Sequence, residues 1–223
     1  FTNTNSIEFN GTSSSIAISD DAAIEPPTAF TVSMWVKIDG NIPTSYLWSK
    51  GLNGDYWARC SHNNSNNGLN FQVRDSGGGS SFLQLPSSTF AYNDNNWHHL
   101  VFVYEASTAL RIYADGTEVS TNTTSIVANA NNNGQDFTLG SQNGASNFMD
   151  GFIDEFSIYS AVLSSGDITS LYNSGTPTDQ TGNANLSFWL RMGDLISGST
   201  LPDQVGSNDG TNTDGTVSTD IPN

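Results

Sequence analysis

Two adjacent histidines, His98 and His99, are the first residues that invite a chemical interpretation. They precede an apolar run in "NNWHHLVFVYE". Paired histidines are typical of metal sites and proton relays. In an extended strand, however, neighbouring side chains point to opposite sides, so two adjacent rings do not readily bind one metal ion. We therefore interpret both histidines as structural residues of a strand that is apolar on both faces, and we expect His62 in a separate Asn-rich loop.

The carboxylates are the next candidates for catalysis. A retaining glycosidase needs two carboxylates about 5 Å apart, and none of the five glutamates has another acidic residue two positions away. Asp154 and Glu155 are adjacent, so in an extended strand they face opposite ways and cannot act as a pair. The chain also contains no nucleophile-elbow, metalloprotease or phosphate-loop motif. We predict that the protein is not an enzyme, with a glycoside hydrolase or lyase as an alternative.

The charge of the chain restricts its partners. Its 223 residues include 22 acidic and six basic residues, which gives a net charge of −16. This charge repels a phosphate backbone, so we expect no nucleic-acid partner. No apolar stretch is long enough to span a bilayer, and we expect no membrane insertion. A cation such as Ca²⁺, or an uncharged partner such as a glycan, suits this field better. The single cysteine, Cys60, excludes an internal disulfide.

Strand patterns separated by Asn, Gly, Ser and Asp clusters dominate the chain. Many short strands with such turns are typical of an all-β, two-sheet antiparallel jelly-roll sandwich. One short helix is expected near 164–173, with Ser164 as the N-cap and Asp167 in the capping box. No linker divides the sequence. We therefore expect residues 1–223 to form a single domain, with 176–223 as a C-terminal extension that completes the sandwich.

Three motifs resemble those of a known family. They are "FTVSMWVKI" at 30–38, "NWHHLVFVYE…LRIYADGTEV" at 96–119 and "FMDGFIDEFSIYSAVLSSGDITSLYNSG" at 148–175. Together with the opening "SIEFNGTSSSIAI", they are similar to the concanavalin A-like, laminin-G-like jelly roll in its bacterial or viral form. This resemblance implies two antiparallel sheets in a curved sandwich with a shallow concave face. The same scaffold serves lectins, adhesion modules, virion proteins and glycoside hydrolases, so it leaves the function open.

A ligand-binding face follows from strand alternation. If Leu69, Phe71 and Val73 point into the core, the residues that alternate with them point away from it, namely Asn70, Gln72 and Arg74. Glycan sites use aromatic platforms together with amide and guanidinium donors. The candidate ligand-binding residues are therefore Arg59, Arg74, Arg111, Trp57, Tyr113 and Gln72. The alternative is that these side chains only solvate a sheet face and pair with nearby acids.

A calcium site is the second hypothesis. In "FIDEFSIY", alternation places Asp154 on one face with Phe152, Phe156 and Ile158, where an unpaired carboxylate is costly. The resemblance implies Asp154 as a Ca²⁺ ligand together with backbone carbonyls around 10–13. The candidate metal ligands are therefore Asp154, Asn10, Gly11 and Ser13. The alternative is that Asp154 simply accepts backbone hydrogen bonds.

These patterns favour a non-catalytic carbohydrate-binding or adhesion module, stabilised by calcium, on a surface or virion protein. The expected partner is a glycan or cell-surface polysaccharide, with neighbouring virion or surface-protein subunits as further partners. The expected location is extracellular, on a cell surface or on a virion. A purely structural decoration or fibre domain of a phage or viral particle is the alternative.

Overall fold

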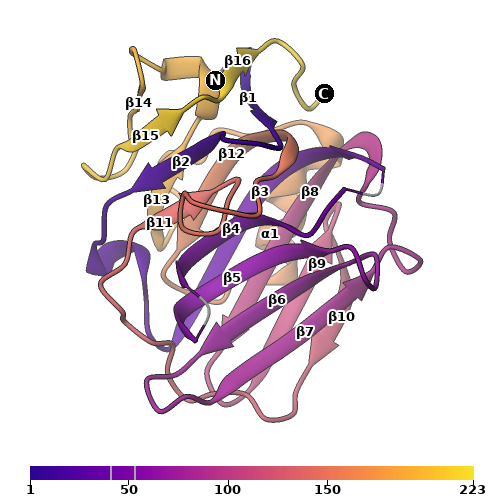
Figure 1. Ribbon diagram of the computed structural model, residues 1–223, viewed down its shortest axis with the longest axis vertical. Coiled ribbons are helices and arrows are strands. Elements are labelled where there is room, and N and C mark those ends of the chain that lie inside the picture. The colour runs from indigo at the N-terminus through magenta and orange to yellow at the C-terminus, as the bar shows by residue number, and fades with distance from the viewer. Residues whose placement is uncertain (41, 53) are drawn as a thin grey trace.

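The computed structural model describes residues 1–40, 42–52 and 54–223, which form two antiparallel sheets packed face to face (Figure 1). The first sheet has the spatial order β10-β9-β8-β3-β12-β1-β16, and β13 also pairs with β12. Its strands are β10 (Thr117–Asn122), β9 (Ala109–Ala114), β8 (Asp94–Glu105), β3 (Ala29–Asp39), β12 (Asp150–Tyr159), β1 (Ser6–Asn10), β16 (Thr216–Ser218) and β13 (Leu186–Leu190).

The second sheet has the order β14-β15-β2-β11-β4-β5-β6-β7. Its strands are β14 (Thr200–Leu201), β15 (Gly210–Thr213), β2 (Ser15–Ile18), β11 (Phe137–Leu139), β4 (Ser45–Leu52), β5 (Asp55–Asn63), β6 (Gly68–Arg74) and β7 (Ser80–Pro86). Short 3-10 turns are η1 (Ala22–Ile24), η2 (Asn173–Gly175) and η3 (Met192–Leu195). The jelly-roll sandwich predicted from strand spacing and turn residues is therefore confirmed. We call the side of each sheet that faces away from the other sheet its outer face.

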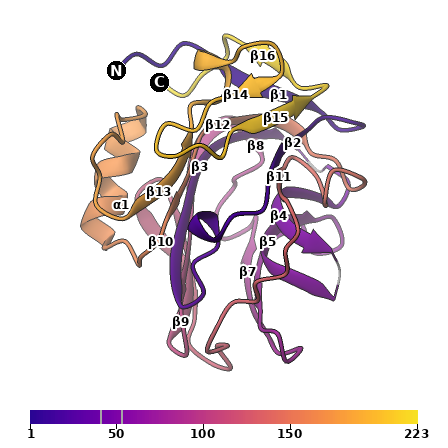
Figure 2. The same ribbon diagram turned by 90° about the vertical axis from the view of Figure 1, so that its left-hand side faces the viewer.

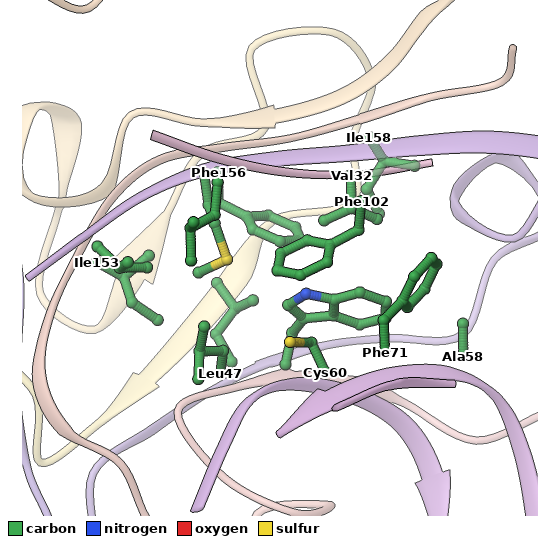
Figure 3. Packing of buried hydrophobic residues seen from close by; sticks show 14 of the residues in the cluster. Val32, Leu47, Ala58, Cys60, Phe71, Phe102, Ile153, Phe156 and Ile158 are labelled. Carbon is green, nitrogen blue, oxygen red and sulfur yellow. The ribbon is translucent and has the colours of Figure 1, made fainter. Parts of the chain in front are cut away.

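The core fills the space between the sheets. Figure 3 shows Phe102, Phe156 and Ile158 of the first sheet facing Leu47, Cys60 and Phe71 of the second. All six side chains are fully buried. Aromatic rings pack through this layer. The Trp48 ring centroid lies 5.7 Å from that of Phe102, which is edge-on, and 5.7 Å from that of Phe137, which is stacked. Burial of each large apolar side chain contributes roughly 1.5–3 kcal/mol, so this layer is the main source of stability. Burial also raises the pKa of the Cys60 thiol well above its usual range.

The outer face of the first sheet is partly covered by the helix α1 (Ser165–Tyr172), as Figure 2 shows. Ser164 caps the helix, and the expected capping box with Asp167 is present in both directions. Beneath the helix, Val101 and Val103 of β8 pack with Ile168 and other apolar residues. Leu100 and Phe102, which alternate with these valines, face the core. Strand β8 is thus apolar on both faces because both faces are covered, as its sequence predicts.

Strands from the C-terminal 176–223 segment enter both sheets. β13 pairs with β12 and β16 pairs with β1 in the first sheet, whereas β15 pairs with β2 in the second. Phe188, Leu190 and Leu201 of this segment are buried in the common core. None of the helices in the described ranges is both long and apolar enough to cross a membrane.

Candidate functional site

Three strands of the second sheet bring most of the predicted ligand-binding residues to one outer face. On β6, Leu69, Phe71 and Val73 are fully buried in the core. Gln72 and Arg74, which alternate with them, are only partly buried. The pairing registers place Arg59 of β5 opposite Gln72, and Gln72 opposite Phe82 of β7. These registers create a row across β5, β6 and β7, and the arrangement that alternation predicted for β6 is confirmed.

Interactions within the face hold its polar side chains in place. The Arg59 guanidinium lies 4.0 Å from the ring centroid of Tyr56 and 5.6 Å from that of Tyr46. Its Nε donates a hydrogen bond of 2.7 Å to Oε1 of Gln72. The Arg74 guanidinium lies 5.7 Å from the same Tyr56 ring. Such contacts restrict the rotamers of long side chains, so a ligand that binds here meets donors that are already oriented.

Phe82 supplies an apolar surface, although it was not among the predicted ligand-binding residues. Its side chain is 43% exposed, which is unusual for an aromatic residue in the middle of a strand. The neighbouring Leu83 and Leu85 point inward and are buried. The alternation in "SSFLQLP" was a usable signal, because two inward leucines require Phe82 to point outward. We call Tyr56, Arg59, Gln72, Arg74 and Phe82 the β5–β7 face.

Trp57, a predicted ligand-binding residue, does not lie on this face. It is fully buried, with its ring centroid 4.2 Å from that of Phe30 in the core. The physical reason is a shift in the β4–β5 register between Ser49 and Gly51, which interrupts the regular alternation. Trp57 therefore turns inward, and its neighbour Tyr56 takes the place next to Arg59.

Arg111 and Tyr113 lie on the other sheet, away from the β5–β7 face. Both are on β9, and they share the outer face of the first sheet. Tyr113 packs into the apolar cluster beneath α1. The Arg111 Nη1 forms an ion pair of 3.1 Å with Glu105. The structure therefore does not assemble these two residues with Arg59 and Arg74, and Arg111 takes the role of a surface ion pair.

The adjacent histidines have separate structural environments. His99 is 1% exposed and makes a 2.8 Å hydrogen bond to Ser33 Oγ, and burial lowers its pKa to about 4. His98 hydrogen-bonds Asp115 and Asp94 at 2.9 and 3.0 Å. Burial opposes its charge, but these two carboxylates outweigh burial and raise the pKa of His98. The two rings hydrogen-bond different side chains, and Asp115 contacts the ring of His98 but the backbone amide of His99, which agrees with a structural role for both.

His62 lies on β5 rather than in the expected loop. It is fully buried, and its Nδ1 hydrogen-bonds the Tyr92 hydroxyl at 2.7 Å. Burial lowers the pKa of His62. Among the described residues, no group of three or more His, Cys, Asp or Glu side chains has the geometry to hold a metal ion.

Asp154 and Glu155 lie on the same side of β12, which contradicts the expected alternation. The register with β3 shifts between Asp154 and Ser157, and Glu155 adopts a left-handed backbone with φ 47°. This bulge turns Phe156 and Ile158 into the core and leaves both carboxylates on the outer face. Both are buried, with exposed fractions of 0% and 1%. They are close enough that the Glu155 charge raises the pKa of Asp154.

The carboxylates of this pair bind different groups. Asp154 Oδ2 accepts a 2.8 Å hydrogen bond from Asn3 Nδ2, and its Oδ1 accepts one from the Glu155 amide. Glu155 accepts a 2.6 Å hydrogen bond from Trp189 Nε1 and lies 3.6 Å from Arg191. Burial is the main cause that raises the pKa of both acids, to about 7 for Glu155. The pair is enclosed by protein, so a substrate does not reach it.

The residues implied as calcium ligands do not form one site. Asn10 pairs with Asp150, four residues before Asp154, which corresponds to about 13 Å along an extended strand. The Gly11 amide donates to the Met149 carbonyl, and the Asn10 side chain accepts from the Ser13 amide. Asp154 instead contacts Asn3 and the backbone of its own bulge, as the alternative hypothesis stated. The set of Asp154 with residues 10–13 therefore does not fit a calcium ion, and calcium binding stays a prediction without these ligands.

A cavity of about 350 Å³ lies between α1 and the segment 178–185. Its acidic groups and the Tyr159 hydroxyl already have structural partners. Asp167 caps α1, Asp179 accepts from the Thr181 amide, and the Tyr159 hydroxyl donates to Gln180. Hydrogen-bonding groups that are satisfied by the protein gain little from a ligand. The β5–β7 face is therefore the stronger candidate site.

Comparison with known proteins supports the fold. Residues 10–169 match the model of a family described as the concanavalin A-like lectin/glucanases superfamily. No curated protein matches the sequence. A solved structure from Bacteroides ovatus, described as that of a proposed carbohydrate binding protein, aligns with a TM-score of 0.73 at 16% identity. The alignment covers 100% of this chain and 62% of that protein.

Toxin binding domains share the same architecture. The binding domain of botulinum neurotoxin serotype G aligns with a TM-score of 0.61 at 16% identity, over 75% of this chain and 42% of that one. The binding domain of Paraclostridial Mosquitocidal Protein 1 aligns with a TM-score of 0.59, also at 16% identity, over 75% and 45%. This chain thus spans less than two thirds of the length of each of these structures.

Proposed function

Because the chain belongs to the concanavalin A-like lectin/glucanase superfamily, we propose that it is a non-catalytic carbohydrate-binding module whose site is the β5–β7 face. One observation carries the proposal, namely the row of Arg59, Gln72 and Phe82 across three adjacent strands. The exposed Phe82 ring offers a flat apolar surface for the C–H face of a sugar. Arg59 and Gln72 offer polar groups beside it for hydroxyls, in the mixture that ligand sites generally use.

The proposal that the module is non-catalytic rests on the positions of two acidic residues in the first sheet. Asp154 and Glu155 are adjacent carboxylates with raised pKa values, which is a feature of many active sites. They are nevertheless enclosed by Asn3, Trp189 and Arg191. General acid–base chemistry requires a carboxyl within hydrogen-bonding reach of the substrate. Their burial therefore supports binding without turnover.

The biological setting of the proposal is an extracellular surface or virion protein that displays this module to a glycan. The description of the Bacteroides ovatus structure, which is similar over the full length of this chain, agrees with carbohydrate recognition. Calcium has no assigned role in the proposed site, because Asp154 and residues 10–13 do not meet. A decoration or fibre domain without a glycan ligand is the competing function.

A glycan array followed by titration calorimetry tests the proposal. We expect the wild-type protein to bind a subset of glycans, and we expect Phe82→Ala and Gln72→Ala each to weaken binding about tenfold, or roughly 1.4 kcal/mol. Phe82 is exposed, so its removal leaves the core intact. Val217→Ala is the matched control, since Val217 is 42% exposed on β16 of the other sheet. No glycan binding by the folded wild type would favour the structural role.

A further inference from the structure

Arg74 differs from most basic residues of this chain in its electrostatic surroundings. The chain has six basic residues against 22 acidic ones, so a carboxylate partner is easy to find. Four basic residues have such partners: Lys37 with Asp220, Lys50 with Asp20 and Glu25, Arg111 with Glu105 and Glu118, and Arg191 with Glu155 and Asp194. Across the residues that the structure describes, Arg74 forms no ion pair.

The position of Arg74 makes its charge available to a ligand. It ends β6 on the outer face, next to the row of Arg59, Gln72 and Phe82. Its Nη2 lies 3.5 Å from the point where a side chain on Gly78 would begin, so the guanidinium extends over the β6–β7 turn. The Tyr56 ring, 5.7 Å away, orients the guanidinium and leaves its N–H groups free to donate.

Two acids close to Arg74, Asp75 and Asp55, already accept hydrogen bonds from other groups. Asp75 accepts a 2.7 Å hydrogen bond from the Gly79 amide within the turn. Asp55, at the start of β5, accepts a 2.9 Å hydrogen bond from Asn131 Nδ2. Both carboxylates stabilise loops at the edge of the β5–β7 face. Arg74 therefore presents a positive charge that these neighbours do not neutralise by direct contact.

We propose that Arg74 makes the β5–β7 face selective for sugars that carry a carboxylate, such as uronic or sialic acid residues. This inference rests on the proposed carbohydrate-binding function. A guanidinium matches a carboxylate through two parallel N–H···O hydrogen bonds, and such charge-assisted bonds are stronger than neutral ones. Phe82 and Gln72 then contact the uncharged part of the same saccharide. Arg74 is in this sense a specificity-determining residue of the site.

The net charge of −16 does not oppose a short acidic ligand at this position. At physiological salt the Debye length is about 8 Å, so acids elsewhere on the surface are largely screened. The contact with Arg74 takes place within hydrogen-bonding distance and is screened much less. A long polyanion, by contrast, would cross acidic surface beyond the face. The test therefore uses short oligosaccharides as ligands.

Matched ligand pairs isolate the carboxylate. One pair is an oligogalacturonide and its fully methyl-esterified form, and the other is sialyllactose and its methyl ester. We expect calorimetry to show about tenfold tighter binding of one acidic member than of its neutral counterpart, the size of one charge-assisted contact. The pair that shows the preference distinguishes uronic from sialic acid. Arg74→Gln is expected to remove the preference, because it weakens binding of the acidic member about tenfold more than binding of the neutral form.

Control variants separate this inference from the proposed function. Arg111→Gln removes a charge on the other sheet and is expected to leave the preference unchanged, and thermal melts verify that both variants are folded. Equal affinity of the wild type for acidic and neutral forms would overturn the role of Arg74 and leave glycan binding intact. The same holds for an acid preference that persists in Arg74→Gln. Failure to bind any member of either pair, together with a silent array, would overturn both proposals.

Discussion

The backbone of one residue, Glu155, determines the chemistry of β12. A regular strand would have sent Asp154 and Glu155 to opposite faces. The left-handed φ of 47° at Glu155 instead buries both carboxyls on one side. Two buried acids cannot both ionise without cost, because each loses hydration and the charges repel. Burial is the largest cause of the raised pKa of both acids. For Asp154 the second cause is the charge of Glu155.

This pair predicts a pH dependence of stability. In the unfolded chain both acids ionise near pH 4, whereas in the folded protein Glu155 has a pKa of about 7 and the pKa of Asp154 is also raised. The folded state therefore binds more protons above pH 4. The free energy of unfolding is expected to fall as the pH rises from about 4 through 7, since its slope follows the difference in bound protons.

Asp154→Asn tests this sign. The neutral amide removes one buried charge, and rotation of the Asn3 amide, whose Oδ1 is buried without a partner, provides an acceptor. We expect urea unfolding to show a gain on the order of 1–2 kcal/mol at pH 8 and little change at pH 4. Asp150→Asn, an exposed position on the same strand, is the control. Loss of stability at pH 8 in Asp154→Asn would contradict the prediction.

At the scale of elements, strand alternation in the sequence predicts β6, β7 and β8 but not β5 and β12. Strands β6 and β7, and β8 from Leu100 to Glu105, pair without a register shift, so their inward and outward residues follow a period of two. β5 and β12 contain register shifts, which move Trp57 inward and Glu155 outward. The irregular segments of β5 and β12 themselves contain no glycine, and Gly51 lies opposite the first of them on β4. Their conformation depends on the neighbouring strand, and a single sequence does not report it.

Resemblance to a family predicts the fold more reliably than it predicts which residues meet in a site. It implied the fold through apolar patterns and turn residues, which the core requires at most positions. It also implied that Asp154 lies beside residues 10–13, which is wrong, because the ligands of a site depend on the register of individual strands. Likewise, Arg111 and Tyr113 share a face as predicted, but strand order puts that face on the other sheet. Arg59, Gln72 and Arg74 come together because they lie on neighbouring strands.

The C-terminal strands provide a prediction at the same scale. A chain that ends at residue 175 lacks β13, β15 and β16, which pair with β12, β2 and β1. It also lacks the buried Phe188, Leu190 and Leu201. Each lost apolar side chain removes about 1.5–3 kcal/mol, a large share of the 5–15 kcal/mol typical of domains. We expect the truncated chain to show no cooperative thermal transition by near-ultraviolet circular dichroism.

A peptide of residues 176–223 serves as the control for that truncation. If the missing strands are integral to the sandwich, adding the peptide to the truncated chain should restore a cooperative transition. A truncated chain that melts like the full chain would show instead that the segment is an appendage. Val217 offers a second control, since its side chain is 42% exposed, and Val217→Ala removes little buried surface and should leave a cooperative transition.

At the scale of the whole molecule, the excess of 22 acidic over six basic residues dominates the response to ions. Like charges on a compact surface repel, and salt weakens this repulsion. Calcium is therefore expected to raise the melting temperature even without a specific site. A specific calcium site would add a stabilisation that grows with the logarithm of calcium concentration above its Kd. Screening and specific binding both raise the melting temperature, but only specific binding depends on which cation is added.

Thermal melts after removal of metal by a chelator distinguish the two effects. Because Asp154 is enclosed by Asn3 and its own bulge, we expect any rise of the midpoint that is specific to Ca²⁺, beyond that of NaCl at matched ionic strength, to be independent of Asp154. The variant Asp154→Asn is expected to respond in the same way as the wild type. A rise specific to Ca²⁺ that disappears in Asp154→Asn would restore the predicted ligand. A rise specific to Ca²⁺ that persists in this variant would place the ion among other oxygen ligands of this acidic surface, since Ca²⁺ needs six to eight of them.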